Sequence, residues 1–90
     1  MNTSRMYRSR CGRHDFGFRF VPRDGHIEIV CTRHPPLGGR DDAVSRTHLY
    51  SSGEICFVAG KEPRTLAEAE RRAAQWAEYL LSYIRTGVSQ

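Results

Sequence analysis

The chain has 90 residues and a formal net charge of +4, and 39% of its residues are hydrophobic. This length gives one small domain with a thin core, because such a chain buries only about 60% of its unfolded surface, so oligomerisation or a partner would stabilise it. No apolar run approaches the ~20 residues of a membrane span, and the first ten residues lack the apolar middle of a signal peptide. We therefore expect a cytoplasmic protein that has no contact with a membrane.

The positive charge is concentrated near the amino terminus. Residues 1–23 hold six arginines and one acid, whereas residues 24–90 hold eight basic and nine acidic residues. Residues 1–13 contain few large apolar groups, so their burial cannot offset the entropy lost when the backbone is ordered. We predict a mobile Arg-rich arm over residues 1–13 and a single domain over residues 14–90. The uneven charge argues against a nucleic-acid-binding face on the folded body, because such a face requires clustered basic groups. A solvated tail is the usual role of an Arg-rich arm, and the alternative is that nucleic acid binds through residues 1–13.

Two segments have the pattern of paired strands. From Asp15 to Val21 every second residue is a phenylalanine, which is the period of a half-buried strand. A second strand is predicted from His26 to Thr32, with Cys31 on its apolar face. Residues 22–25, Pro-Arg-Asp-Gly, form a turn sequence between them. The pattern predicts an antiparallel hairpin with an aromatic and aliphatic face to bury.

The next part of the chain is irregular. Residues 34–42, HPPLGGRDD, contain two prolines and two glycines and are predicted to form a loop. After this loop, two short apolar stretches at residues 49–50 and 55–58 flank Ser-Ser-Gly-Glu. They predict either a tight hairpin or a looser turn around Gly53.

The carboxy-terminal quarter is predicted to be one long helix from Leu66 to Thr86. Thr65 and Glu68 have the spacing of a capping box, and Gly87 is a natural stop. Apolar residues recur at steps of three and four and form one stripe: Leu66, Ala69, Ala73, Trp76, Ala77, Leu80 and Ile84. The predicted fold class is α+β, with a small antiparallel sheet of three to four strands packed against this one long C-terminal helix.

The segment His48–Cys56, HLYSSGEIC, resembles the active-site segment of ubiquitin-conjugating-enzyme-like (UBC-like) domains. In that family a His-Pro-Asn triplet precedes a hydrophobic residue, a Gly-containing turn and the acceptor cysteine. With Cys56 set on the acceptor, Gly53 falls on the turn glycine and His48 on the asparagine, a position that is often histidine in bacterial members. Pro35-Pro36 stands at the family's spacing from the triplet, and the long helix, closed by Thr86-Gly87, is similar to a Trp- and Tyr-containing helix of the bacterial group.

This sequence also departs from the family pattern. It lacks the amino-terminal helix, the 34–42 loop stands where a strand would be expected, and no room remains after Gly87 for the closing helices. The resemblance therefore implies a truncated UBC-like scaffold, which can keep the fold without the activity.

The resemblance implies thioester chemistry without a cofactor. Cys56 would accept the carboxy-terminal acyl group of a ubiquitin-like protein from an activating enzyme and pass it to an amine. His48 would donate a hydrogen bond to the oxyanion or act as a base, and Tyr50 and Gly53 would shape the turn. Some bacterial members are linked to antiviral conjugation systems. The alternative for Cys56 is a small apolar residue buried between Ile55 and Phe57.

Two further hypotheses remain open. The chain could be a non-catalytic interaction module that binds a partner, or a second copy of itself, through Trp76, Tyr79 and Tyr83. Alternatively, two Cys-x2-His pairs could form a structural zinc site in a domain that binds nucleic acid; the pairs are Cys11 with His14 and Cys31 with His34. Strand alternation argues against zinc, since it directs Cys31 into the core.

Overall fold

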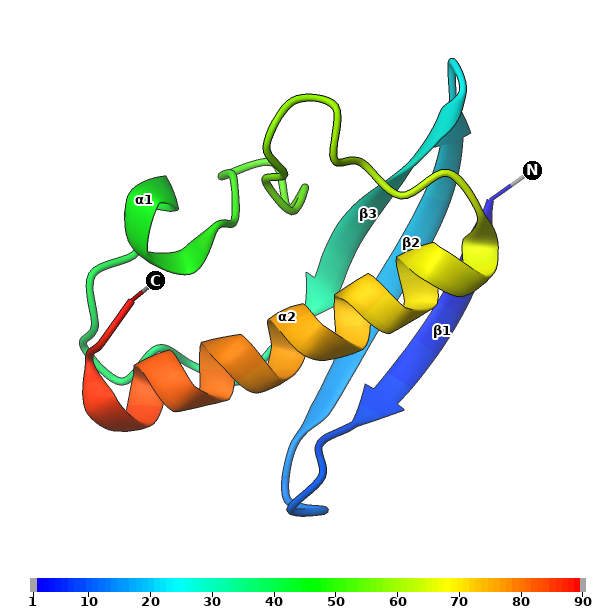
Figure 1. Ribbon diagram of the computed structural model, residues 1–90. Coiled ribbons are helices and arrows are strands. Elements are labelled where there is room, and N and C mark those ends of the chain that lie inside the picture. Colours follow the sequence, from blue (N-terminus) through cyan, green and yellow to red (C-terminus); the bar gives the residue numbers. More distant parts are fainter. Residues whose placement is uncertain (1, 90) are drawn as a thin grey trace.

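The computed structural model of the protein describes residues 2–89. Its elements are strands β1 (Thr3–Arg8), β2 (Asp15–Arg23) and β3 (His26–Arg33), the one-turn helix α1 (Val44–Thr47) and the long helix α2 (Leu66–Thr86). The strands form one antiparallel sheet in the order β1-β2-β3, and α2 crosses one face of it (Figure 1). The predicted α+β class is therefore confirmed, with three strands in the sheet.

The central β2–β3 hairpin follows from the alternation of its side chains. Phe16, Phe18 and Phe20 are at most 2% exposed, whereas Arg19 between them is exposed. Phe16 and Phe18 each meet Trp76 of α2 edge to face, with ring centroids 6.2 and 6.0 Å apart. The aromatic face predicted from the sequence therefore forms the core. Its other members are Ile29, Cys31, Ile55, Ala69, Ala73, Ala77, Leu80 and Tyr83.

Strand β1 overturns the prediction of a mobile arm for most of that segment. Thr3–Arg8 pairs with β2 along its whole length, from Thr3 opposite Phe20 to Arg8 opposite Asp15. Tyr7 packs its ring against Phe16 and donates a hydrogen bond to Glu78 of α2. The composition argument counted only apolar side chains, but an edge strand is also stabilised by main-chain hydrogen bonds, which any residue supplies.

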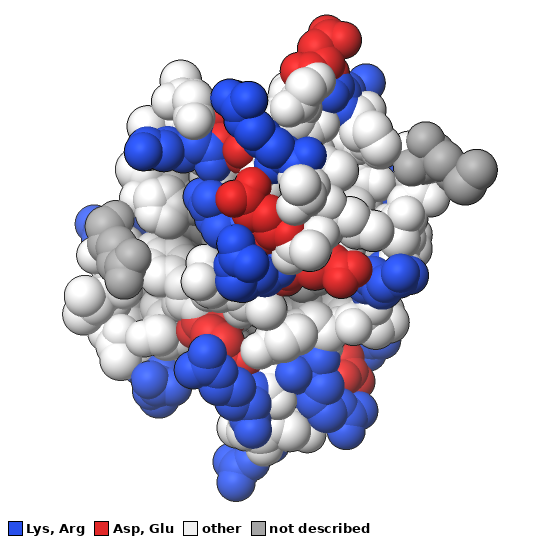
Figure 2. Space-filling view, turned by 45° about the vertical axis from the view of Figure 1, so that its right-hand side comes forward, with Lys and Arg blue, Asp and Glu red and all other residues white. Residues whose placement is uncertain are grey.

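Several arginines of the basic amino-terminal region pair with acids on the ordered surface. The Arg8 guanidinium donates hydrogen bonds to both carboxylate oxygens of Asp15, at 2.9 and 3.1 Å. The Nε atom of Arg5 lies 3.5 Å from a carboxylate oxygen of Glu70. Figure 2 shows Lys and Arg side chains interspersed with Asp and Glu over one face of the molecule. The arginines of β1 are thus carried by a folded strand, and nucleic-acid binding through residues 1–13 stays a prediction.

Helix α2 begins and ends where its capping residues predict. The Thr65 hydroxyl accepts a hydrogen bond from the Glu68 amide at 3.1 Å, and Gly87 closes the helix with φ of 76°. The helix has 21 residues, about 31 Å at 1.5 Å per residue, which is enough to cross the sheet. The predicted apolar stripe faces the sheet, with its end residues Leu66 and Ile84 partly buried. None of the helices within residues 2–89 is long and apolar enough to cross a membrane.

The chain between β3 and α2 covers the free edge of β3. Residues 34–42 form the predicted loop, α1 follows, and residues 48–56 then fold back on themselves through a bridge between Leu49 and Ile55. This turn docks on β3, because the Ile55 amide donates to the Ile29 carbonyl at 2.9 Å and the Cys31 amide donates to the Gly53 carbonyl at 2.7 Å. We call residues 48–56 the 48–56 hairpin.

Candidate active site around Cys56

The 48–56 hairpin places His48 and Cys56 opposite each other on its two arms. The Leu49–Ile55 bridge sets the register, and the Cys56 amide donates to the His48 carbonyl at 2.7 Å. Ile55 is buried in the core and Leu49 packs against it. Because side chains alternate along each arm, residues 48, 50 and 56 belong to the other side of the hairpin. Tyr50 is accordingly 46% exposed.

Gly53 allows the hairpin to approach β3 closely. Its φ is +95°, a left-handed conformation that side chains disfavour. A Cβ atom at this position would lie 3.1 Å from the Cys31 carbonyl oxygen and 3.4 Å from a methyl group of Val30. The position predicted as the turn glycine therefore requires glycine for two reasons, its backbone angle and its close contact with β3.

The Cys56 thiol is half-buried and accepts a hydrogen bond from Tyr50. The hydroxyl oxygen of Tyr50 lies 3.3 Å from the Cys56 sulfur. The pKa of Tyr50 is raised, first because its hydroxyl donates to Cys56 and second because negative charge on that sulfur disfavours a phenolate. A hydroxyl donor stabilises a thiolate, and the thiolate is the form of cysteine that attacks a carbonyl carbon. The alternative of a deeply buried Cys56 is not what the structure shows.

The sequence assigned Tyr50 to the turn and missed its contact with the thiol. Tyr50 and Cys56 lie diagonally across the hairpin, and diagonal neighbours on one face are within reach of an aromatic side chain. The signal lies in the spacing, since a bend centred on residue 52 sets residue 50 opposite residue 54 and next to residue 56. The sequence did not distinguish a tight hairpin from a looser turn, so the register became clear only from the Leu49–Ile55 bridge.

His48 has an unusual backbone conformation, and its ring contacts Tyr79. Its φ of 56° is the one positive value for a residue other than glycine within the described part of the chain. Its ring packs against Tyr79 of α2 with centroids 5.4 Å apart. Within residues 2–89 the imidazole makes no hydrogen bond with Cys56. The two predicted catalytic residues are thus adjacent through the backbone, and the direct polar contact to the thiol comes from Tyr50.

Aromatic side chains of α2 hold the segment that leads into His48. The Trp76 indole donates to the Thr47 carbonyl at 2.9 Å, Tyr79 donates to the Arg46 carbonyl, and Tyr83 donates to the Asp41 carbonyl at 2.7 Å. Trp76 is 6% and Tyr83 2% exposed. These two residues, which the sequence predicted to bind a partner, therefore lie inside the molecule. Their burial is possible because acceptors within the chain satisfy their polar atoms.

The end of α2 is fixed to the 34–42 loop by Arg40. Its guanidinium donates to the Ile84 carbonyl at 3.1 Å and to the Arg85 carbonyl at 3.3 Å. These carbonyls belong to the last turn of α2, where carbonyls lack partners within the helix and attract positive charge. The loop and the segment after it are thus attached to α2 at several successive points.

The predicted zinc ligands do not converge. Cys11 is exposed in the β1–β2 turn, whereas Cys31 is buried and donates to the Arg33 carbonyl at 3.3 Å. Burial raises the pKa of Cys31 to about 11. No group of three or more His, Cys, Asp or Glu side chains within residues 2–89 is arranged to hold a metal ion. Strand alternation turns Cys31 into the core, as the sequence argument against zinc had indicated.

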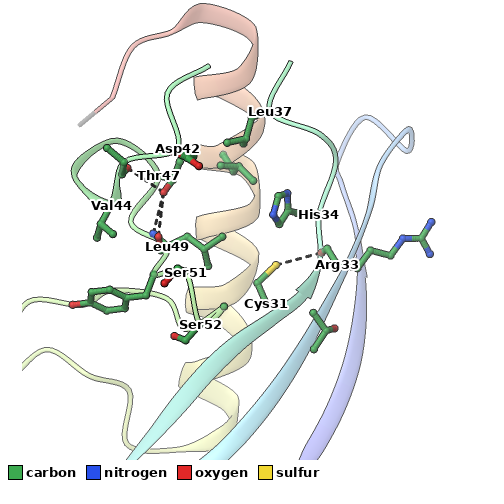
Figure 3. A pocket seen from close by; sticks show the side chains of 15 residues that line it. Cys31, Arg33, His34, Leu37, Asp42, Val44, Thr47, Leu49, Ser51 and Ser52 are labelled. Carbon is green, nitrogen blue, oxygen red and sulfur yellow. Dashed lines mark hydrogen bonds between the residues drawn. The ribbon is translucent and has the colours of Figure 1, made fainter. Parts of the chain in front are cut away.

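A cavity of about 940 Å³ lies beside the 48–56 hairpin, between β3, the 34–42 loop and α1 (Figure 3). Leu37, Val44 and Leu49 supply apolar wall, and His34 and Asp42 supply charge and polarity near the loop. Its volume falls within the range of small-molecule sites, which is about 300–1,000 Å³. The sequence predicted only a loop over residues 34–42 and gave no indication of this cavity.

The geometry of the 48–56 hairpin is the basis on which a function is assigned. Comparisons of the chain with protein-family models, with curated proteins and with solved structures found no match.

Proposed function

We propose that this chain carries an acyl group as a thioester on Cys56, as UBC-like proteins do, with a ubiquitin-like protein and its activating enzyme as partners. The observation that carries the proposal is the hydrogen bond from the Tyr50 hydroxyl to the Cys56 sulfur, at 3.3 Å on a half-buried thiol. The α+β arrangement, with the hairpin docked between β3 and the long helix, supports the resemblance drawn from the sequence.

In the loading step, the Cys56 thiolate attacks the carbonyl carbon of a thioester on the donor. The bond between Cys56 sulfur and that carbon forms, the bond to the donor's sulfur breaks, and the donor leaves as a thiolate that takes up a proton from water. Tyr50 supports this step by donating a hydrogen bond from its hydroxyl to the attacking sulfur, since this bond stabilises the anion before attack.

In the discharge step, an amine attacks the same carbon. A carbon–nitrogen bond forms, the carbon–sulfur bond breaks, Cys56 is regenerated as a thiolate, and the amine loses a proton to a base. His48 is the group assigned to this base, because imidazole exchanges protons near neutral pH and His48 lies opposite Cys56 in the hairpin.

A small thioester tests the loading step without knowledge of the natural donor. The probe is a peptide ending in Gly-Gly with its carboxyl group activated as a thioester of 2-mercaptoethanesulfonate. The protein carries Cys11→Ser, which removes the exposed thiol as a competitor. We expect intact-mass analysis to show one added acyl group that is removed by hydroxylamine.

The matched control carries Cys56→Ser in the same Cys11→Ser background. Loss of the hydroxylamine-sensitive adduct in this control assigns it to Cys56. An adduct of equal yield in the control, or acyl transfer no faster than to a short cysteine peptide, would contradict the proposed function.

A further inference from the structure

His48 is held in a strained conformation by contacts on both sides. A residue other than glycine in the left-handed region is sterically strained, and this conformation persists where the surroundings determine it. Its amide donates to the Val44 carbonyl at 2.8 Å as it closes α1, and its carbonyl accepts from the Cys56 amide at 2.7 Å. The backbone of His48 therefore cannot relax without breaking one of these bonds.

Tyr79 contacts His48 with its ring and the segment before His48 with its hydroxyl. The hydroxyl donates to the carbonyl of Arg46, two residues before His48, and the ring packs on the imidazole with centroids 5.4 Å apart at an angle of 41°. Trp76 and Tyr83 also donate to carbonyls of this segment, but their rings make no aromatic contact with His48 among the described residues. Tyr79 is thus the residue of α2 that fixes the ring as well as the backbone.

We propose that Tyr79 is a positioning residue, which orients the His48 imidazole for the discharge of Cys56. This role rests on the proposed function. Tyr79 acts through His48, because its hydroxyl is bonded to a main-chain carbonyl and is not directed at the sulfur. The ring contact sets the side-chain orientation, and the left-handed backbone sets the point from which that side chain projects.

The first test observes the imidazole itself. Proton NMR resonances of the His48 ring are assigned by their loss in His48→Asn, because asparagine tolerates the left-handed region. An aromatic ring at this distance displaces those resonances, so we expect Tyr79→Leu to move them toward the values of an unfolded histidine. Tyr79→Phe keeps the ring and should retain them.

The matched control is Tyr83→Phe, which removes a hydroxyl that donates to the Asp41 carbonyl but leaves the surroundings of the His48 ring unchanged. We expect no movement of the His48 resonances in this variant. Unmoved resonances in Tyr79→Leu, or an equal movement in Tyr83→Phe, would overturn the positioning role. Urea unfolding of each variant verifies that the compared proteins are folded.

The second test measures the reaction, using Cys11→Ser protein loaded with the Gly-Gly peptide and free lysine as the amine. We expect discharge about tenfold slower in Tyr79→Leu and in His48→Asn, a modest share of what a general base contributes, and a rate close to wild type in Tyr79→Phe. Loading should be unchanged in both Tyr79 variants. Failure of the Cys11→Ser protein to load contradicts the proposed function. Normal loading with unchanged discharge in Tyr79→Leu, beside slower discharge in His48→Asn, overturns the role of Tyr79 alone, and unchanged discharge in both variants overturns the role of His48 as well.

Discussion

The indole nitrogen of Trp76 lies 2.9 Å from the carbonyl oxygen of Thr47, the residue immediately before His48. Thr47 is 2% exposed, so this carbonyl has no ready access to water. The bond therefore joins the middle of α2 to the start of the 48–56 hairpin. Together with the bonds from Tyr79 and Tyr83, it makes α2 the support of the candidate site.

The Trp76 bond predicts a loss of stability in Trp76→Phe. Phenylalanine keeps an aromatic ring against Phe16 and Phe18 but leaves the Thr47 carbonyl without its donor, which costs about 1–3 kcal/mol. Urea unfolding followed by circular dichroism measures the change. Tyr83→Phe removes the donor to the carbonyl of Asp41, which is exposed and can bond water instead, so this variant should cost less. Equal stabilities of wild type and Trp76→Phe would show that the bond does not hold the segment.

The approach of the hairpin to β3 predicts a severe effect of Gly53→Ala. The new methyl group would meet the Cys31 carbonyl oxygen at 3.1 Å in a left-handed conformation. We expect a destabilisation of about 2 kcal/mol or more, because backbone strain and a close contact add. The control is Gly25→Ala, with φ of +76° and nothing within 4 Å, which should cost about 1 kcal/mol. Similar costs at the two positions would mean that the contact with β3 is unimportant.

The three thiols are predicted to react in the order Cys11, Cys56, Cys31. Cys11 is exposed, and its pKa is lowered chiefly by the hydrogen bond with Ser9. Cys31 is buried, and its pKa is raised to about 11, so that it should react only when the protein opens. Pulsed alkylation with iodoacetamide, followed by peptide mass analysis, gives the order. Early labelling of Cys31 in folded protein would contradict the buried position.

Cys31 also predicts a loss of stability in alkaline solution. The folded protein keeps the thiol proton up to a pKa of about 11, whereas the unfolded chain releases it near 9. The unfolded state therefore binds fewer protons between these values, and the free energy of unfolding falls as the pH rises, by about 3 kcal/mol at most. Urea titrations at pH 8 and pH 11 measure the fall. Because tyrosines titrate in the same range, the contribution of Cys31 is the difference between wild type and Cys31→Val, and no difference would refute it.

The parts of the fold that were predicted from the sequence depend on local pattern. Alternate phenylalanines define β2, and Thr65 and Gly87 define the ends of α2, because in each case neighbouring residues determine the structure. Strand β1 was missed because its pairing with β2 is stabilised by main-chain bonds and by contacts such as Tyr7 with Glu78, 71 positions away.

The sequence indicated which residues make up the candidate site, but not which side chains contact one another there. Cys56 and His48 are adjacent in the hairpin, yet the donor to the sulfur is Tyr50 and the neighbour of the imidazole is Tyr79. Both contacts depend on a register or on a distant helix, which composition and spacing do not define. The roles of Trp76 and Tyr83 were hidden for the same reason, since their acceptors are carbonyls of an irregular segment.

The reactivity of Cys56 in the folded protein bears most directly on the proposed thioester chemistry. The measurement is the rate of reaction of Cys56 with iodoacetamide in Cys11→Ser protein, folded and in urea, with Tyr50→Phe beside it. We predict that Cys56 reacts in the folded state at least as fast as in the unfolded chain, and more slowly once the Tyr50 hydroxyl is removed. Reaction of Cys56 only after unfolding, with no effect of Tyr50→Phe, would contradict a nucleophilic role for this thiol.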